Sequence, residues 1–168
     1  MLSMKGLFIG RFQPFHNGHL EAIRFALKQV EILWIVIGSA QRSHEQRNPF
    51  TAGERLSMIR DTLLNTEIDP RRWYAIPLYD ATHHYIWSRE LDMLVPEYDV
   101  VFTNDPITTI LFKEIGKEVI GVELKDRDNL SGTEIRRRIA SNEEWRHLVS
   151  KETAMIIDKK SDRLRVIL

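Results

Sequence analysis

The stretch that decides the fold is Gly10-Arg11-Phe12-Gln13-Pro14-Phe15-His16-Asn17-Gly18-His19, which follows a short apolar run and precedes a segment with helical periodicity. Two histidines and an arginine therefore stand where a strand leads into a helix. The N-terminus of a helix has unpaired backbone N–H groups and about half a positive charge, so it attracts phosphate. His16 and His19 can share one face of that helix, and Gly18 lets a bulky group approach the backbone. The stretch predicts a site for a triphosphate.

Short apolar runs alternate along the chain with segments long enough for a helix. Residues 6–10 and 32–38 are rich in Ile, Leu and Val, which is typical of buried strands in a parallel sheet. Between them, apolar residues recur at helical spacing, namely Leu20, Ile23, Ala26, Leu27 and Val30. Further candidate strands lie at 73–78, 100–103 and 118–122. We expect one α/β domain over residues 1–168, doubly wound and Rossmann-like, with a mainly parallel sheet of about five strands and a helical C-terminus.

Two helix starts are marked by capping residues. Thr51 with Glu54, and Ser131 with Glu134, each have the spacing of a capping box. In open sheets of the predicted kind, ligands bind beyond the carboxyl ends of the strands, where the strand order reverses. Because the stretch from Gly10 to His19 follows the first strand, we expect it at this edge.

Composition limits the possible partners. The 24 basic and 24 acidic residues among 168 cancel, which argues against a general surface for nucleic acid. The chain has no cysteine, so neither disulfides nor thiolate metal sites are possible. The sequence has no signal-like apolar region at its start and no apolar run of about eighteen residues. We expect a cytoplasmic protein with no membrane partner.

Four blocks of the sequence together resemble a known family. His16-Asn17-Gly18-His19 is similar to the HxGH signature of the nucleotidyltransferase superfamily. With Gly38-Ser39-Ala40-Gln41, the block from Asn48 to Arg55 and the block from Ser131 to Arg138, the chain resembles the archaeal-type nicotinamide-nucleotide adenylyltransferases. The resemblance implies adenylyl transfer from ATP to nicotinamide mononucleotide (NMN), giving NAD and pyrophosphate in NAD biosynthesis. It also implies a homo-oligomer such as a hexamer.

This reaction needs positive charge and alignment, because two anions must approach each other and the attacking phosphate needs no general base. Arginine and histidine suit that task, since arginine binds phosphate with two parallel donors and histidine titrates near neutral pH. The candidate catalytic residues are His16, His19, Arg11, Arg47 and Arg136. Many enzymes of triphosphates use Mg²⁺ held by the substrate oxygens. We therefore expect Mg²⁺ as the cofactor and no metal ligand from the protein.

The resemblance implies that His16 and His19 contact the phosphates of ATP while Arg136 closes over them. Donors from the start of a second helix would bind the same phosphates. The candidate ATP-binding residues are Gly10, Arg11, Phe12, His16, Gly18, His19, Ser131, Gly132, Thr133 and Arg136.

The acceptor contains a flat cationic ring, which an aromatic face would hold by stacking and cation–π attraction. Trp87 matches the family position for this contact. The candidate acceptor-binding residues are Ser39, Asp80, His84, Trp87 and Asn104. His84 stands where the resemblance implies an amide side chain, and Asp105 is inserted into a turn that is Gly-Asn-Pro in relatives. The roles of Asp105, His44 and His83 stay open.

Simpler interpretations compete with these assignments. The histidine pair can do no more than cap or pack a helix start, and histidines at this spacing can bind zinc, although no persuasive third ligand is present. Successive helical residues point about 100° apart, so the three consecutive arginines from Arg136 cannot all face one ligand. Arg47 lies in a polar loop where an exposed arginine often has no specific role. Trp87 can belong to the core, and Asn104 can be a turn residue.

The acceptor and the presence of catalysis also stay open. The same HxGH element occurs in enzymes with other acceptors, so nicotinate mononucleotide, FMN and phosphopantetheine remain alternatives to NMN. A module that binds nucleotide without turnover is a further alternative. Class I aminoacyl-tRNA synthetases are disfavoured, because the chain has neither room for a tRNA-binding domain nor a basic excess.

Overall fold

Five parallel strands form the centre of the protein, in the order β3-β2-β1-β4-β5. The computed structural model describes residues 3–123, 126 and 128–168. The strands are β1 (Lys5–Gly10), β2 (Ile32–Ile37), β3 (Trp73–Pro77), β4 (Val100–Phe102) and β5 (Glu118–Ile120). The predicted five-stranded sheet is confirmed, and it is parallel throughout. Most strands end one or two residues earlier than expected.

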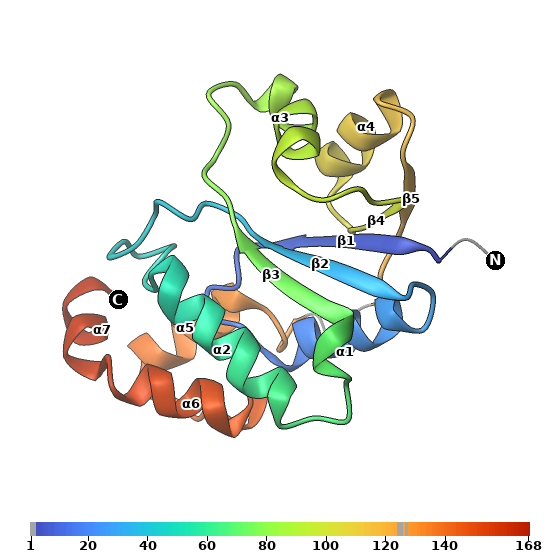
Figure 1. Cartoon of the computed structure of the whole chain (residues 1–168). Helices are drawn as coiled ribbons and strands as arrows, with labels where there is room; N and C mark the ends of the chain where they lie inside the picture. Colours follow the sequence, from blue (N-terminus) through green and yellow to red (C-terminus); the bar gives the residue numbers. More distant parts are fainter. Residues whose placement is uncertain (1–2, 124–125, 127) are drawn as a thin grey trace.

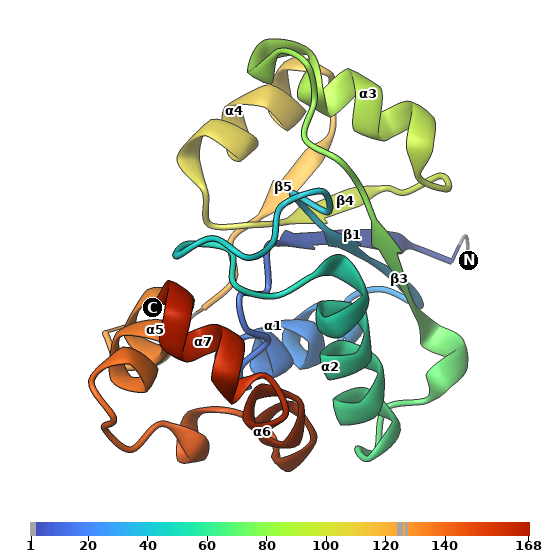
Figure 2. The ribbon, with the colours of Figure 1, turned by 90° about the vertical axis from the view of Figure 1, so that its left-hand side faces the viewer.

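Helices cover both faces of this sheet (Figure 1). Helices α3 (Trp87–Leu94) and α4 (Pro106–Glu114) lie on one face, and α1 (Asn17–Leu27) and α2 (Ala52–Leu64) lie on the other. The C-terminal helices α5 (Gly132–Ala140), α6 (Lys151–Asp158) and α7 (Ser161–Ile167) gather beside α1 and α2 (Figure 2). Short 3-10 turns are η1 (Pro70–Arg72), η2 (His84–Ile86) and η3 (Arg146–Leu148). The expected doubly wound fold with a helical C-terminus is confirmed.

Apolar side chains on both faces of the strands create two cores. In β1, Leu7 packs with Val101 and Phe112 beneath α3 and α4, while its neighbour Phe8 belongs to the larger core beneath α1 and α2. Burying one such side chain contributes about 1.5–3 kcal/mol. Helix α1 ends at Leu27, so Val30 lies beyond the helix although it is buried in the same core. None of the helices in the described ranges combines the length and apolar character needed to cross a membrane.

The predicted capping boxes differ in outcome. At α2, the Thr51 hydroxyl accepts from the Glu54 N–H at 3.1 Å and the Glu54 carboxylate accepts from the Thr51 N–H at 3.0 Å, so the box is complete. At α5, the Ser131 hydroxyl caps the Glu134 N–H at 3.1 Å. The Glu134 carboxylate instead binds Arg137 and Arg138, so the second half of that predicted box is wrong. Two adjacent arginines compete successfully for the carboxylate.

The strand order reverses between β1 and β4, with β2 on the other side of β1. The connections beyond β1 and β2 leave the sheet at its carboxyl edge, on the left in Figure 1. This edge carries residues 11–16, 38–51 and 103–105, which hold the candidate residues Arg11, Phe12, His16, Ser39, Arg47 and Asn104. The fold therefore brings separate sequence blocks to one place, as expected for a doubly wound sheet.

Candidate active site

The histidine pair caps helix α1. His16 is the N-cap residue, and its Nδ1 atom accepts a hydrogen bond from the Gly18 N–H at 3.1 Å. The His16 N–H donates to Nδ1 of His19 at 3.2 Å, and the two rings stack with centroids 3.6 Å apart. Because both Nδ1 atoms accept, each neutral ring carries its proton on Nε2. Capping therefore leaves one N–H donor on each ring.

Both histidines are held neutral. Burial lowers the pKa of His16 to about 4, and burial together with the neighbouring His16 lowers the pKa of His19 well below 6.5. The expectation that this pair supplies charge near neutral pH is therefore corrected. The rings offer hydrogen-bond donors, and positive charge must come from elsewhere.

Gly18 makes room for one of these histidines. A Cβ atom added to Gly18 would lie 2.9 Å from Cε1 of His16, closer than real Cβ contacts. The bulky group that approaches the backbone here is thus a side chain of the same motif.

Arg136 reaches this motif from α5. Its Nη1 donates to the Gln13 carbonyl at 2.7 Å and its Nη2 donates to the Thr133 hydroxyl at 3.3 Å. A Cβ on Gly132 would lie 2.9 Å from Nη1 of Arg136 and 3.0 Å from the Gln13 carbonyl oxygen, so a side chain there would displace this guanidinium. Burial, together with the positive charges of Arg11 and Arg47, lowers the pKa of Arg136 to about 10. Three arginines from three segments therefore converge.

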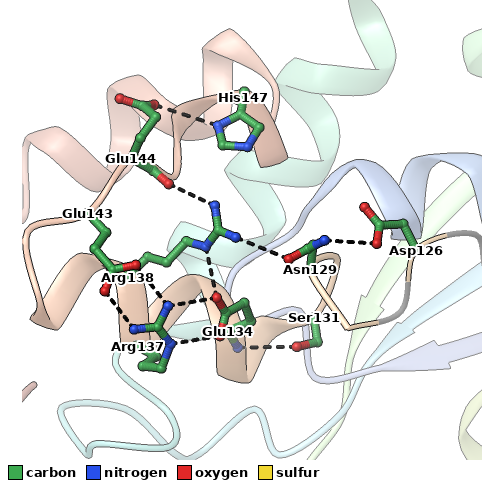
Figure 3. Close-up of polar contacts among 9 residues, drawn as sticks. All are labelled: Asp126, Asn129, Ser131, Glu134, Arg137, Arg138, Glu143, Glu144 and His147. Carbon is green, nitrogen blue, oxygen red and sulfur yellow. Dashed lines mark hydrogen bonds and ion pairs between the residues drawn. The ribbon is translucent and has the colours of Figure 1, made fainter.

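The next two arginines point elsewhere (Figure 3). Arg137 pairs with Glu134 and Glu143 at 2.8 Å each, and Arg138 pairs with Glu134 at 2.8 Å. The argument that the three consecutive arginines cannot share a direction is confirmed.

Two adjoining cavities lie at the carboxyl edge. The first, of about 500 Å³, is lined by Arg11, Ser39, Arg42, Glu45, Gln46, Arg47 and Asn48. The second, of about 420 Å³, is lined on its acidic and aromatic side by Asp80, His84, Trp87 and Asp105. Arg11 and Ser39 line both cavities. A cationic compartment therefore meets an aromatic and acidic one, and Arg11 stands where they join.

Trp87 serves both the core and the second cavity. It is half-buried at the first position of α3, with its ring edge-on to Phe112 at 5.7 Å between centroids. The ring of His84 lies nearly parallel to it, at 6.4 Å and 3°. The two interpretations of Trp87 are thus compatible.

The polar acceptor candidates divide into two groups. The Ser39 hydroxyl donates to Asp80 at 2.7 Å, and Arg42 pairs with the same carboxylate at 3.3 Å, which fixes Asp80 beside the cavity. Asn104, in contrast, does not line either cavity described above. Its amide binds both backbone groups of Val122, which joins the ends of β4 and β5. These contacts are the ones expected if Asn104 is a turn residue.

Asp105, to which the sequence assigns no role, lines the second cavity. Its carboxylate accepts from the Thr108 N–H at 2.7 Å as the N-cap of α4, and this bond lowers the pKa of Asp105. Its charge therefore persists at neutral pH. His44 and His83 are exposed and line neither cavity.

Sequence reasoning missed two buried polar residues. Gln13 pairs with both backbone groups of Phe50 at 2.9 Å, which ties the first motif to the loop before α2. Arg55 is fully buried in α2. A signal for it existed, because Arg55 occupies the helical stripe otherwise formed by Met58, Ile59, Thr62 and Leu63. A charged residue on a buried stripe indicates a specific task.

Comparisons with known proteins agree with the geometry. The chain matches the cytidylyltransferase-like family over residues 7–138. It is 46% identical over 153 residues to the nicotinamide-nucleotide adenylyltransferase of Thermococcus kodakarensis, covering 91% of this chain and 81% of the relative. It is 44% identical over 165 residues to the enzyme of that name from Thermococcus onnurineus, covering 97% and 88%.

A solved structure is similar over nearly the whole chain. A bifunctional NMN adenylyltransferase/ADP ribose pyrophosphatase from Francisella tularensis, complexed with AMP and a Mn ion, superposes with a TM-score of 0.78 at 25% identity. The match covers 99% of this chain and 52% of that protein, so this chain spans about half its length. The resemblance noted in the sequence is thereby confirmed, and the chain belongs to the cytidylyltransferase-like family, together with these nicotinamide-nucleotide adenylyltransferases.

Proposed function

We propose that this protein transfers the adenylyl group of ATP to NMN, giving NAD and pyrophosphate. The observation that carries the proposal is the pair of cavities that share Arg11 and Ser39. The cationic cavity suits a polyphosphate, and the cavity with Trp87, Asp80 and Asp105 suits a flat cationic ring. The names of the relatives support the same activity.

In the proposed reaction, a phosphate oxygen of NMN attacks the α-phosphorus of ATP. A bond forms between these atoms, and the bond from the α-phosphorus to the oxygen that bridges to the β-phosphorus breaks, so pyrophosphate leaves with the electron pair. The attacking oxygen is already anionic, which makes a general base unnecessary. Arg11, Arg47 and Arg136 would neutralise the approaching anions. The Nε2–H groups of His16 and His19 would donate to phosphate oxygens.

The other candidate residues would orient the substrates. Ser131, Gly132 and Thr133 stand at the N-terminus of α5, where backbone donors suit phosphate. Gly10, Phe12 and Gly18 would shape the ATP side. Trp87 would stack on nicotinamide, with Ser39, Asp80 and His84 beside it; the contacts of Asn104 favour it least.

We expect a divalent cation to bind at this site through the substrate. Within the described residues, no group of three or more His, Asp or Glu side chains could hold a metal ion. Phosphate oxygens would therefore bind the cation, which we infer to be Mg²⁺, and it would neutralise charge on the departing pyrophosphate. A Mn ion accompanies AMP in the Francisella protein. The hexamer and the cytoplasmic location stay predictions.

Pyrophosphate release tests the function directly. We expect release when the protein is mixed with ATP, Mg²⁺ and NMN, and much less with FMN or phosphopantetheine. A parallel assay with nicotinate mononucleotide measures how strictly the acid form is rejected. Release with FMN or phosphopantetheine alone would contradict the acceptor assignment, and ATP binding without release from any acceptor would identify a nucleotide-binding module.

A further inference from the structure

Arg55 is a buried cation whose hydrogen bonds all go to backbone carbonyls. Its Nη1 donates to the carbonyls of Arg11 and Gly38, each at 2.8 Å. Its Nη2 donates to those of Ser39 at 3.1 Å and Arg42 at 3.4 Å, and its Nε donates to that of Thr51 at 3.1 Å. None of the ion pairs in the described part of the chain includes Arg55. One guanidinium thus joins the ends of β1 and β2 to the start of α2.

The carbonyls that it binds adjoin two left-handed residues. Phe12 has φ of 52° and Ser39 has φ of 49°, a region that residues with a side chain seldom adopt. The Arg11 carbonyl belongs to the peptide before Phe12, and the Gly38 and Ser39 carbonyls belong to the peptides on either side of Ser39. Such conformations persist where their surroundings hold them, and they cluster at functional sites. Arg55 binds at both strained places at once.

Four of its five backbone partners also line the candidate site, among them Gly38 in the second cavity. Arg11 and Ser39 line both cavities, and Arg42 lines the cationic one. Holding their carbonyls fixes the direction in which their side chains leave the backbone. A buried cation without a carboxylate partner lowers the stability of the fold. Packing alone therefore does not explain why an arginine occupies position 55.

We propose that Arg55 is a positioning residue, which sets the backbone so that Arg11, Ser39 and Arg42 face the two substrates. The proposal rests on the adenylyl transfer inferred above. Arg55 touches neither cavity, so it acts through these residues. Its planar set of donors is the required property, and a lysine cannot reproduce it.

Arg72 provides a matched control at the opposite edge of the sheet. Its guanidinium also donates to backbone carbonyls, those of Leu27 and Val30 at 2.7 Å and Glu31 at 2.9 Å. These carbonyls belong to the end of α1 and to the connection from α1 to β2, and their residues line neither cavity. Arg55→Lys and Arg72→Lys therefore make the same chemical change to the same kind of contact.

The test compares both variants with the wild type in three measurements. These are the melting temperature, kcat and KM for ATP and NMN from pyrophosphate release, and hydrogen–deuterium exchange of peptides covering 10–13, 27–31 and 38–42. For Arg55→Lys we expect faster exchange at 10–13 and 38–42 and a kcat about 10- to 100-fold lower, as for misaligned reactants. For Arg72→Lys we expect faster exchange at 27–31 and an unchanged kcat.

Wild-type kcat in Arg55→Lys, or an equal loss of kcat in both variants below their melting temperatures, would overturn the proposal. If Arg55→Lys does not fold, Arg55→Gln, which keeps two donors without the charge, takes its place. Failure of both Arg55 variants to fold while Arg72→Lys folds assigns Arg55 to stability alone and also overturns the proposal. If the wild type releases no pyrophosphate, adenylyl transfer fails separately, and the exchange data with calorimetric ATP affinities still test the role of Arg55.

Discussion

Arg136 and Arg137 are adjacent in the sequence and lie in opposite surroundings. Arg137 belongs to a network of ion pairs with Glu134, Arg138 and Glu143, in which each arginine faces a carboxylate (Figure 3). Arg136 is acted on by the positive charges of Arg11 and Arg47, and the ion pairs found among the described residues include none of these three. The same residue type is neutralised on the surface and left uncompensated at the site.

On the proposed function, this difference would let a chain of zero net charge bind a polyphosphate. Mutual repulsion contributes to the lowered pKa of Arg136, so the cluster is unfavourable until an anion joins it. Exposed ion pairs contribute little to stability because water and salt screen them. Charge balance over the whole sequence therefore says little about one site. The predictions below test whether the two groups of arginines differ in function.

The largest expected effect comes from Arg136→Lys. Lysine keeps the charge and loses the two parallel donors that match phosphate oxygens. We expect kcat/KM for pyrophosphate release to fall about 10²- to 10³-fold, the scale for loss of one preorganised donor. Arg138→Lys is the control, since Arg138 belongs to the surface network, and it should change kcat/KM little. Similar losses in both variants would remove the distinction between the two groups.

A second prediction separates catalysis from capping at the histidine pair. His19→Ala should lower kcat about 10²-fold or more, because it removes an Nε2–H donor. It also removes the acceptor for the His16 N–H, so the melting temperature should fall. His19→Gln keeps an acceptor at the position that glutamine favours in capping boxes. It should restore stability and leave kcat low; recovery of both would show that the ring serves only as a cap.

The strands and the first site motif could be predicted from the sequence because their signals are local. Apolar runs identified five strands, and the residues before His19 identified a strand-to-helix junction. The choice of Arg136 over its two neighbours combined helical geometry with the family resemblance, and Arg136 does lie apart from them. The site assignments themselves await experiment.

What could not be predicted depends on contacts between distant segments. The neutrality of His16 follows from burial, which one sequence does not reveal. The five carbonyls around Arg55 come from three segments that meet only in the folded sheet. The sequence leaves Asn104 open between a substrate contact and a turn residue, and the Val122 backbone that its amide binds is brought by β5. In each case the sequence shows the residue but not the distant groups that surround it in the fold.

Substitution of Trp87 tests the second cavity, which is lined by acidic and aromatic side chains. If Trp87 stacks on nicotinamide, Trp87→Ala should raise KM for NMN about 30-fold, equivalent to about 2 kcal/mol, with KM for ATP nearly unchanged. Trp87→Phe should recover part of this loss. Thermal melting is measured alongside, because the contact with Phe112 also matters to the core. A large loss of stability with no selective effect on NMN would remove Trp87 from the acceptor site.

The neutral histidines predict a dependence of stability on pH. The pKa of His16 is about 4 in the folded protein, below its ordinary value of 6.5, so the unfolded chain binds more protons between these values. Stability is therefore complete above pH 6.5 and falls as the pH decreases toward 4, by on the order of 2 kcal/mol at pH 5 from His16 alone. Urea unfolding at pH 7.5 and pH 5 measures this. His16→Asn, which keeps a favourable N-cap, should reduce the difference; an unchanged difference would assign it to other groups.

The smallest expected effect concerns the network of ion pairs around Glu134. Arg137→Gln removes the pairs with Glu134 and Glu143, yet Glu134 keeps Arg138 as a partner. Because the side chains of Arg137 and Glu143 are about half exposed to water, we expect a slight decrease in melting temperature at about 0.1 M salt that vanishes near 1 M, where charges are screened within about 3 Å. Turnover should equal that of the wild type at each salt concentration, since Arg137 points away from Arg136. Salt should still weaken ATP binding in both proteins, because the uncompensated arginines remain. A loss of turnover in Arg137→Gln that salt does not abolish would mean that the surface network holds α5 in place for Arg136, and the two groups of arginines would then act as one.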